Sequence, residues 1–322
     1  HTTPDKKKKR KAFPQKKNTA VKMLKLPLIS FVVTSYNYEK YILKTLESIK
    51  EQTYKNFEII VVDDCSIDNS CKAVEEFISD NQDLRITLIK HEKNSGQLAS
   101  MITGLKASSG QFISFIDSDD VLCKEYAASH IRVHLETSVA FTSCQIIEIG
   151  EEDEIHTLNS ISSPQSNDCK ILEQVQNDTT GIEILCDTPV EYKILKHKPF
   201  GGWYWSPNSS AMFRKTSIEI LESYSETQNW RICPDKFLFN FAHLLGGSAI
   251  IYRPLIGYRR HKNNAGNCTL VTGDKRLHSD YITKINIENN LKIRPETIKF
   301  LWQERKTLGC RNTLKLILLT LL

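Results

Sequence analysis

Four apolar segments recur along the first third of the chain, each rich in β-branched or aromatic side chains: 28–35, 57–64, 84–90 and 111–117. Continuous apolar runs of this length are typical of strands that are buried on both faces of a sheet. The stretches between them carry apolar residues near helical spacing, so strand and helix alternate. Such alternation with short connections predicts an α/β fold, in which helices on both faces cover a mostly parallel sheet.

The second half of the chain is more varied. A helix near 123–135 and a strand at 139–147 precede a polar segment, 150–180, which we interpret as an insertion or a long loop. An aromatic, glycine-rich stretch follows, and then a helix at 235–245 and a strand at 248–255. From about residue 275 onward the pattern is helical.

We expect one main domain at 26–270, divided into halves at 26–135 and 136–270, and a helical extension at 271–322. The chain ends in the apolar stretch NTLKLILLTLL. Three interpretations of this stretch are open: a helix on a membrane surface, a helix that binds a partner, or the truncation point of a longer protein.

The positive charge of the chain is concentrated at its start. Residues 1–25 contain ten Lys or Arg and one acid, whereas the remainder carries 33 basic and 37 acidic side chains. This tail has no apolar periodicity, so we expect it to be disordered. It is either a solvated tail left over from protein expression, a segment attracted to anionic lipid, or a nuclear or nucleic-acid signal. A basic tail on an acidic body is weak evidence for nucleic acid, so no nucleic-acid partner is expected.

Cysteine usage and hydropathy bear on the cellular compartment. The nine cysteines are an odd number and form no C-x-x-C pair, which argues against a disulfide framework or a zinc cluster and fits a reducing cytosol. No signal peptide is visible, and no apolar run reaches the roughly 18 residues of a membrane-spanning helix. We therefore expect a cytoplasmic protein, with the inner face of the membrane as the alternative location.

Polar side chains follow three of the predicted strands at the point where each strand ends: TSYN at 34–37, DDCS at 63–66 and DSDD at 117–120. Because ligands bind beyond the carboxyl ends of the strands in such sheets, these tips should meet at one rim. Crowded carboxylates suit Mg²⁺ or Mn²⁺, which neutralises their mutual repulsion. The alternative is that Asp119 and Asp120 only cap the following helix.

No glycine-rich phosphate loop is present, because neither G-x-G-x-x-G nor G-x-x-x-x-G-K-[ST] occurs. A nucleotide would therefore be held through a metal-bound diphosphate and through side chains of the rim. Asp64 can accept a hydrogen bond from a base, Tyr36 can stack on a flat ring, and Thr34 offers a short polar contact.

The stretches SFVVTSYNYEKYILKTLESIKEQTYKNFEIIVVDD and NSGQLASMITGLKASSGQFISFIDSDD resemble the nucleotide-sugar half of the inverting glycosyltransferases of family 2, which have the GT-A fold. The resemblance covers about 27–135. It implies that Thr34, Tyr36 and Asp64 contact the nucleoside, most often uridine. It also implies that Asp117 lies by the ribose and the metal, and that Asp119 is the principal ligand of Mn²⁺ or Mg²⁺. Ser118, between these two acids, is assigned to the nucleotide site with them.

Two departures from the family pattern stand out. The family usually has glycine where this chain has Cys65, a difference that we expect to change little. An Arg-Asn pair that is common in the third helix of the family is replaced by Met101 and Ile102. The donor contact of that arginine is then either absent or supplied elsewhere, and Gln97 is the candidate.

The second half resembles the family less closely. Family members carry a carboxylate at the start of a helix beneath the acceptor, and ICPDKFLFNF offers Asp235 at that place. Its role would be that of a general base, which removes the proton of the acceptor hydroxyl during attack on the anomeric carbon. The alternative is a helix N-cap.

Further candidates lie in YRRHKNN and GGWYWSPNSS. His261 could complete the metal shell or contact the diphosphate, or it could be structural. Arg259 or Arg260 could offset the charge of the leaving group. Trp203 and Trp205 offer flat surfaces for an acceptor or donor sugar, although they are equally explained as core aromatics.

The resemblance therefore implies a metal-dependent inverting glycosyltransferase, with Mn²⁺ or Mg²⁺ as cofactor. It would move a sugar from a nucleotide sugar, most often a UDP-sugar, to a hydroxyl of a glycan or lipid-linked acceptor in cell-surface polysaccharide assembly. One alternative is a nucleotidyltransferase or another metal-dependent nucleotide enzyme, although TSYNYEKY lacks the glycine- and arginine-rich loop of the former. The other is a non-catalytic carbohydrate- or membrane-binding relative, which should have lost the rim acids.

Overall fold

The computed structural model describes residues 25–159, 189–195, 203–261 and 280–321. The predictions for the tail before residue 25 and for most of the polar segment at 150–180 lie outside the described residues.

The first four predicted strands form one parallel block with the order β3-β2-β1-β4. Their bounds are β1 Ile29–Ser35, β2 Phe57–Asp63, β3 Ile86–Lys90 and β4 Phe112–Asp117. The parallel arrangement expected from the apolar runs is therefore confirmed for this half of the molecule.

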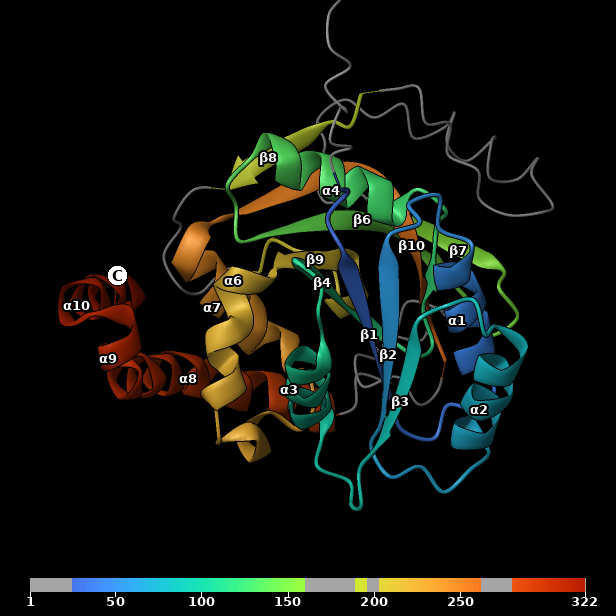
Figure 1. The fold of residues 1–322 in the computed structure, drawn as a ribbon. Coiled ribbons are helices and arrows are strands. Elements are labelled where there is room, and N and C mark those ends of the chain that lie inside the picture. The colour runs from blue at the N-terminus through green and yellow to red at the C-terminus, as the bar shows by residue number, and fades with distance from the viewer. Residues whose placement is uncertain (1–24, 160–188, 196–202, 262–279, 322) are drawn as a thin grey trace, which may run out of the picture.

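Three crossover helices connect these strands and cover both faces (Figure 1): α1 Ile42–Lys50, α2 Ser70–Asp80 and α3 Gln97–Ala107. Successive side chains of a strand point to opposite faces. Phe31 accordingly packs in the cluster that holds the apolar residues of α1 and α2, while Val32 packs in the cluster that holds those of α3. Both faces of β1 are buried, which explains its continuous apolar sequence.

The second half extends the same sheet with mixed pairing. The strands are β5 Val121–Leu122, β6 Phe141–Ile149, β7 Ile155–Asn159, β8 Tyr192–Leu195, β9 Ala211–Arg214 and β10 Ser248–Arg259. β9 joins the two halves, because it pairs antiparallel with both β4 and β6. β10 runs parallel to β6, whereas β5, β7 and β8 add antiparallel edges. The complete ten-stranded sheet is thus mixed.

One expectation for this half was wrong. Residues 155–159 form strand β7, which pairs antiparallel with β6, although they lie in the segment interpreted as a loop. The turn that precedes β7 is closed by backbone hydrogen bonds between Gly150 and Glu154 and between Asp153 and Gly150. A hairpin at the sheet edge therefore begins where the polar sequence suggested irregular chain.

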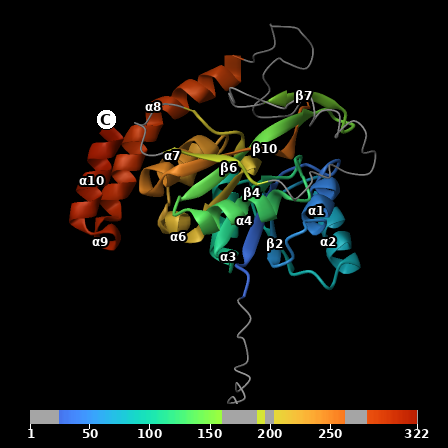
Figure 2. The ribbon, with the colours of Figure 1, turned by 90° about the horizontal axis from the view of Figure 1, so that it is seen from above.

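The remaining helices complete the layers: α4 Tyr126–Glu136, α6 Lys215–Ile218, α7 Asp235–Gly246, α8 Asp280–Gln303, α9 Arg305–Leu308 and α10 Cys310–Leu321. α7 buries Phe237, Phe239 and Phe241 in the cluster that also holds α3. The last three helices lie on the side of the molecule away from α1 and α2 (Figures 1 and 2). In the part of the chain that is described, no helix has both the length and the hydropathy to cross a bilayer.

Candidate active site

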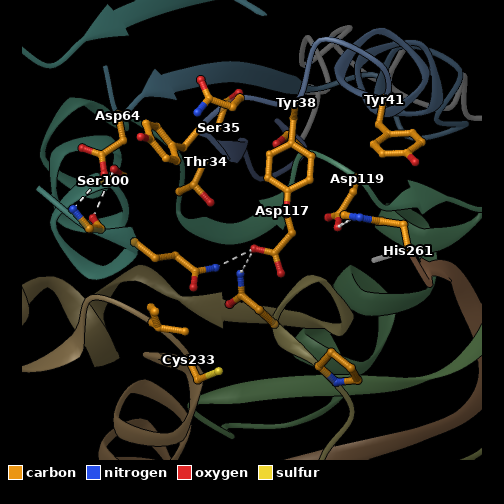
Figure 3. A pocket seen from close by; sticks show the side chains of 18 of the residues that line it. Thr34, Ser35, Tyr38, Tyr41, Asp64, Ser100, Asp117, Asp119, Cys233 and His261 are labelled. Carbon is orange, nitrogen blue, oxygen red and sulfur yellow. Dashed lines mark hydrogen bonds and ion pairs between the residues drawn. The ribbon is translucent and has the colours of Figure 1, made fainter. Parts of the chain in front are cut away.

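A pocket of about 1560 Å³ opens at the carboxyl ends of β1, β2 and β4. It is larger than the roughly 300–1,000 Å³ of a typical small-molecule site, so it has room for two substrates. Its lining includes the predicted residues Thr34, Tyr36, Asp64, Gln97, Asp117, Ser118, Asp119, Trp203, Asp235, Arg260 and His261. Figure 3 shows Thr34, Asp64, Asp117, Asp119 and His261 around this space. The prediction that the segments 34–37, 63–66 and 117–120 each contribute to one site at the ends of the strands is therefore confirmed.

Asp64 is fixed at the end of β2 by the loop that leads into α3. Its carboxylate accepts hydrogen bonds from the backbone N–H groups of Ser95 (2.8 Å) and Gly96 (2.7 Å), and His91 Nδ1 lies 2.8 Å away. Gly96 has φ +92°, and a Cβ there would come within 2.8 Å of the Arg231 backbone, so the loop requires glycine. A carboxylate has about four acceptor positions, which leaves Asp64 one for a ligand N–H.

The tip of β1 is tied to the tip of β2. Ser66 Oγ accepts a hydrogen bond from the backbone N–H of Asn37 at 2.8 Å, and Asn37 Oδ1 accepts one from Ile67 N–H at 2.8 Å. These bonds hold Asn37 at φ +61°. Thr34 is buried at the end of β1, whereas Tyr36 is 42% exposed. Tyr36 therefore presents an open ring at the edge of the pocket, as stacking on a base requires.

Asp117 lies at the centre of the pocket between two amide side chains. Its Oδ1 accepts hydrogen bonds from Gln97 Nε2 (2.8 Å) and from Asn208 Nδ2 (3.0 Å), as Figure 3 shows. Burial, and then the nearby charge of Asp119, raises the pKa of Asp117 to about 7. Gln97 lines the pocket, but its amide is directed at Asp117. Met101 and Ile102, at the positions of the missing Arg-Asn pair, are buried in the core.

Asp119 and His261 form the pair best suited to a metal ion. Asp119 Oδ2 lies 2.9 Å from His261 Nε2, and both side chains are buried at the edge of the pocket. The His261 ring packs against Tyr41 (ring centroids 5.0 Å apart) and against the edge of Tyr38 (5.7 Å). Burial, with Asp119 and Asp117 nearby, raises the pKa of Tyr38 far above its ordinary value.

The chemistry of these ligands fits Mn²⁺ or Mg²⁺ shared with a substrate. Within the described ranges, no group of three or more histidine, cysteine or acidic side chains would hold a metal ion by itself. Ions of this type commonly take one or two protein ligands and complete their shell with phosphate oxygens and water. Asp119 and His261 provide a carboxylate oxygen and an imidazole nitrogen for such a shared site.

Asp120 and Ser118 have different environments from Asp119. Asp120 is buried and its Oδ1 accepts a hydrogen bond from the backbone N–H of Arg259 at 3.0 Å, which joins the turn to β10. Ser118 is buried in the pocket lining, and its Oγ has no hydrogen-bond partner among the described residues. α4 begins only at Tyr126 and has no side-chain cap, so the alternative that Asp119 and Asp120 cap this helix was wrong.

Arg259 and Arg260 also have different environments, although they are neighbours in the sequence. Arg259 has no exposed surface and does not line the pocket. Its Nε donates to the carbonyl of Asp119 at 2.8 Å, its Nη1 donates to the carbonyl of Gly150 at 2.8 Å, and its guanidinium pairs with Asp153. The suggested contact of Arg259 with a diphosphate is therefore contradicted, because backbone carbonyls enclose its charge. Arg260 does line the pocket, where it forms an ion pair with Glu148.

Asp235 lines the pocket and is the first residue of α7. Its Oδ1 accepts a hydrogen bond from the backbone N–H of Lys236 at 2.9 Å. Burial raises the pKa of Asp235 to about 6, and its charge in turn contributes to the raised pKa of Asp117, so the two carboxylates are close. The N-cap position is occupied by Pro234, and no side chain caps the helix there. The N-cap alternative for Asp235 was wrong.

The two tryptophans have separate environments. Trp203 is 41% exposed, lines the pocket and stacks on Phe239 with ring centroids 5.4 Å apart. Trp205 is only 3% exposed and donates from Nε1 to Ser248 Oγ at 2.9 Å. Trp205 is therefore a core aromatic and not a sugar-stacking surface, whereas Trp203 keeps an open face.

The pocket and supporting residues that were not predicted from the sequence include Tyr38, His91, Asn208 and Arg231. Tyr38 directly follows the segment TSYN, and Asn208 lies in the aromatic, glycine-rich stretch, so the sequence around both residues pointed to the site. No sequence pattern pointed to Arg231. Its guanidinium bonds Asn94, and its carbonyl accepts from the N–H of Gln97 at 3.0 Å, contacts that only the folded chain brings together.

Comparisons with known proteins identify the family of this chain. The family model described as glycosyl transferase family 2 matches residues 30–197. A putative glycosyltransferase of Bacillus subtilis, EpsH, is 40% identical over 242 residues, which cover 74% of this chain and 62% of EpsH. The Escherichia coli enzyme WfgD, named as a UDP-Glc:alpha-D-GlcNAc-diphosphoundecaprenol beta-1,3-glucosyltransferase, is 38% identical over 114 residues, or 35% of this chain and 44% of WfgD.

Solved structures agree on the fold. The crystal structure of residues 1–349 of S. aureus TarS superposes with a TM-score of 0.51 at 16% identity, over 91% of this chain and 70% of that one. The chain spans about half the length of two curated relatives, WfgD and the B. subtilis glycosyltransferase TuaG. The family match, over more than half of the sequence, and the GT-A architecture together establish that the chain belongs to glycosyltransferase family 2.

Proposed function

We propose that this chain moves a sugar from a UDP-sugar to a hydroxyl of a glycan or lipid-linked acceptor, with inversion at the anomeric carbon and with the help of a divalent metal ion. The observation that carries the proposal is the arrangement of one pocket. Asp64, the Asp119–His261 pair and Asp235 all line this pocket, and Asp119 Oδ2 lies 2.9 Å from His261 Nε2.

A uridine donor is favoured by the groups at the nucleoside end. Asp64 retains an acceptor position for the N–H of a pyrimidine, Thr34 offers a short polar contact, and Tyr36 offers a ring for stacking. The name of the relative WfgD gives UDP-Glc as its donor, and one structure of S. aureus TarS contains UDP-GlcNAc. Both support a UDP-sugar here without identifying the sugar.

Asp119 and His261 would hold the metal, with Asp117 and Ser118 beside them and the diphosphate as the remaining ligand. A bound Mn²⁺ or Mg²⁺ supplies positive charge against the diphosphate as it leaves. Arg260, whose guanidinium pairs with Glu148 at the edge of the pocket, is the arginine placed to add to this stabilisation.

Asp235 would act as the general base. The acceptor hydroxyl oxygen attacks the anomeric carbon from the face opposite the diphosphate, the bond from that carbon to the diphosphate oxygen breaks, and the hydroxyl proton passes to the Asp235 carboxylate. A pKa of about 6 leaves this carboxylate ionised at neutral pH, yet more basic than an ordinary aspartate. The open face of Trp203 is then available to stack on a sugar ring.

The names of two relatives support a proposal for the acceptor and the pathway. WfgD is named for a lipid-linked acceptor, diphosphoundecaprenol carrying GlcNAc, and TuaG is named as a putative teichuronic acid biosynthesis enzyme. We assign this chain to cell-surface polysaccharide assembly of the same kind, at the inner face of the membrane.

The direct test is a panel of nucleotide sugars incubated with the protein and Mn²⁺, with release of the nucleoside diphosphate as the readout. We expect one UDP-sugar to be turned over well above the rest, and Asp119→Asn to lower that turnover at least a hundredfold. Asp80→Asn, on the exposed end of α2, is the matched control and should change nothing. The proposal fails if no donor is turned over, or if Asp119→Asn is as active as the unaltered protein.

A further inference from the structure

Helix α10 has an unusual distribution of side chains. Its most deeply buried positions are two threonines, Thr313 and Thr320, which face the rest of the molecule. Leu314, Leu318 and Leu321 instead are 54%, 63% and 57% exposed. Leucines in a helix normally occupy the buried face. On α10, Leu316, Ile317 and Leu319 pack against the core, whereas Leu314, Leu318 and Leu321 form a second, exposed apolar side.

The three exposed leucines form one stripe. At 100° per residue, positions 314, 318 and 321 fall within about 60° of one another around the helix axis. α8 contacts the end of α10, where Arg294 donates from Nη1 to the carbonyl of Leu321 at 3.5 Å. Leu291, one turn before Arg294 on the same face of α8, is 73% exposed. Leu291 is thus a further exposed apolar residue on α8, the helix that packs beside α10 (Figure 2).

Positive charge borders the stripe. Arg311 and Lys315 are exposed on α10 next to the leucines, on the side away from the two buried threonines. The sequence from Arg305 to the end of the chain contains four Lys or Arg and no Asp or Glu. A leucine face bordered by cations and free of acids is the composition of helices that lie in the interface of an anionic bilayer.

We propose that the outer face of α10, formed by Leu314, Leu318 and Leu321 with Arg311 and Lys315, docks on an anionic lipid surface. The leucines enter the boundary between headgroups and acyl chains, and the cations contact lipid phosphates. We place α10, Cys310–Leu321, along the membrane surface, because its exposed leucines and its cations lie on neighbouring sides of the helix. This inference concerns binding alone, so it stands or falls independently of the sugar-transfer proposal.

The test is flotation of the full chain with vesicles of phosphatidylcholine alone or mixed with phosphatidylglycerol. We expect the unaltered protein to prefer the phosphatidylglycerol vesicles, and Leu318→Ser to lower its partition coefficient about tenfold. Leu135→Ser is the matched control, because Leu135 is similarly exposed at 66% but lies on α4. Any contribution of the basic residues 1–25 is the same in all three proteins.

Charge is tested separately. Arg311→Gln with Lys315→Gln should weaken the preference for phosphatidylglycerol relative to the unaltered protein, which carries the same basic tail, and leave the weak binding to pure phosphatidylcholine unchanged. Circular dichroism and the unfolding midpoint confirm that each variant is folded. Equal partition of Leu318→Ser and Leu135→Ser would overturn the proposal. So would sedimentation that shows a dimer, dissolved by Leu318→Ser, together with no vesicle binding, because α10 would then bind a second copy.

Discussion

Asp235 has the pKa of a base that works near neutral pH. Burial raises its pKa to about 6 from an ordinary value near 4. Below this pKa the carboxyl is protonated and cannot accept the acceptor proton, so kcat should fall about tenfold per pH unit below pH 6 and level off above it. The check is a kcat profile from pH 5 to 8 at saturating donor and acceptor. A flat profile over this range would show that another group accepts the proton.

Cys65 occupies a backbone conformation that favours glycine. Its φ of +66° lies in the left-handed region, which costs a residue with a side chain about 1 kcal/mol. The expectation that cysteine in place of the family's glycine changes little therefore overlooked a cost in folding free energy. The sequence could not show the sign of φ, because it depends on how the loop after β2 closes.

We expect Cys65→Gly to raise the free energy of unfolding by about 1 kcal/mol, measured by urea denaturation. Cys71→Gly is the matched control. Cys71 lies in the first turn of α2, where glycine lowers helix stability, so the same substitution should destabilise the protein. If both substitutions shift stability in the same direction, backbone strain at Cys65 is not the cause.

At the scale of elements, the packing of α3 on β1 depends on Gly104. A Cβ at this position would lie 2.2 Å from Cγ1 of Val32, a buried residue of the central strand. Alanine normally stabilises a helix relative to glycine by about 1 kcal/mol. Here overpacking should outweigh that gain, and we expect Gly104→Ala to lower stability by about 1–2 kcal/mol.

The matched test is a double-mutant cycle. Val32→Ala alone leaves a cavity and destabilises the protein, but it also makes room for the new methyl group. Gly104→Ala should therefore be less damaging, or even favourable, in the Val32→Ala background, as urea denaturation would measure. An additive cycle would mean that the two side chains do not compete for the same space.

Elements with a strong local pattern were predictable from the sequence. The apolar runs of β1 to β4 and the helical periodicity between them predicted the alternation of strands and helices along the chain and a mostly parallel sheet. β9 had no such pattern, because only four residues, Ala211–Arg214, form it and its position depends on β4 and β6 on either side. β7 was missed because its partner, β6, and not its polar sequence determines its conformation.

Site residues, too, could be predicted only where the local sequence carried a pattern. Motifs at strand ends identified Asp64, Asp117 and Asp119, because the geometry of a parallel sheet brings such ends together. Pattern could not separate Arg259 from Arg260, since neighbouring residues of a strand point to opposite faces and the register was unknown. One is enclosed by backbone carbonyls and the other lines the pocket.

For the whole molecule, the buried histidines of α4 link stability to pH. Burial lowers the pKa of His134 to about 3 and lowers that of His130 as well. His134 Nε2 lies 2.9 Å from the carbonyl of Met212, which the neutral ring can satisfy. Because the unfolded chain takes up protons below about pH 6.5 and the folded chain does not, stability falls as the pH falls from there. The raised pKa values of Asp117 and Asp235 act in the opposite sense and offset part of this loss.

We therefore expect His134→Gln to flatten the acid side of the stability curve. Between pH 7.5 and 5.0 the unaltered protein should lose about 2 kcal/mol more than the variant, by urea denaturation at the two pH values. The glutamine amide can still donate to the Met212 carbonyl, so the variant loses the titrating group and keeps a hydrogen-bond donor there. Equal losses in the two proteins would mean that His134 is not the group that couples folding to protons.

We propose that one pocket holds a uridine diphosphate through a metal ion at Asp119 and His261. Calorimetric titration with UDP, in Mn²⁺ and then in EDTA, measures this coupling. We expect UDP to bind at least tenfold more tightly with Mn²⁺, Asp119→Asn to abolish this gain, and Asp235→Asn to preserve it. Equal UDP affinity with and without Mn²⁺, or a gain that survives Asp119→Asn, would show that UDP is not held through a metal ion at this pair.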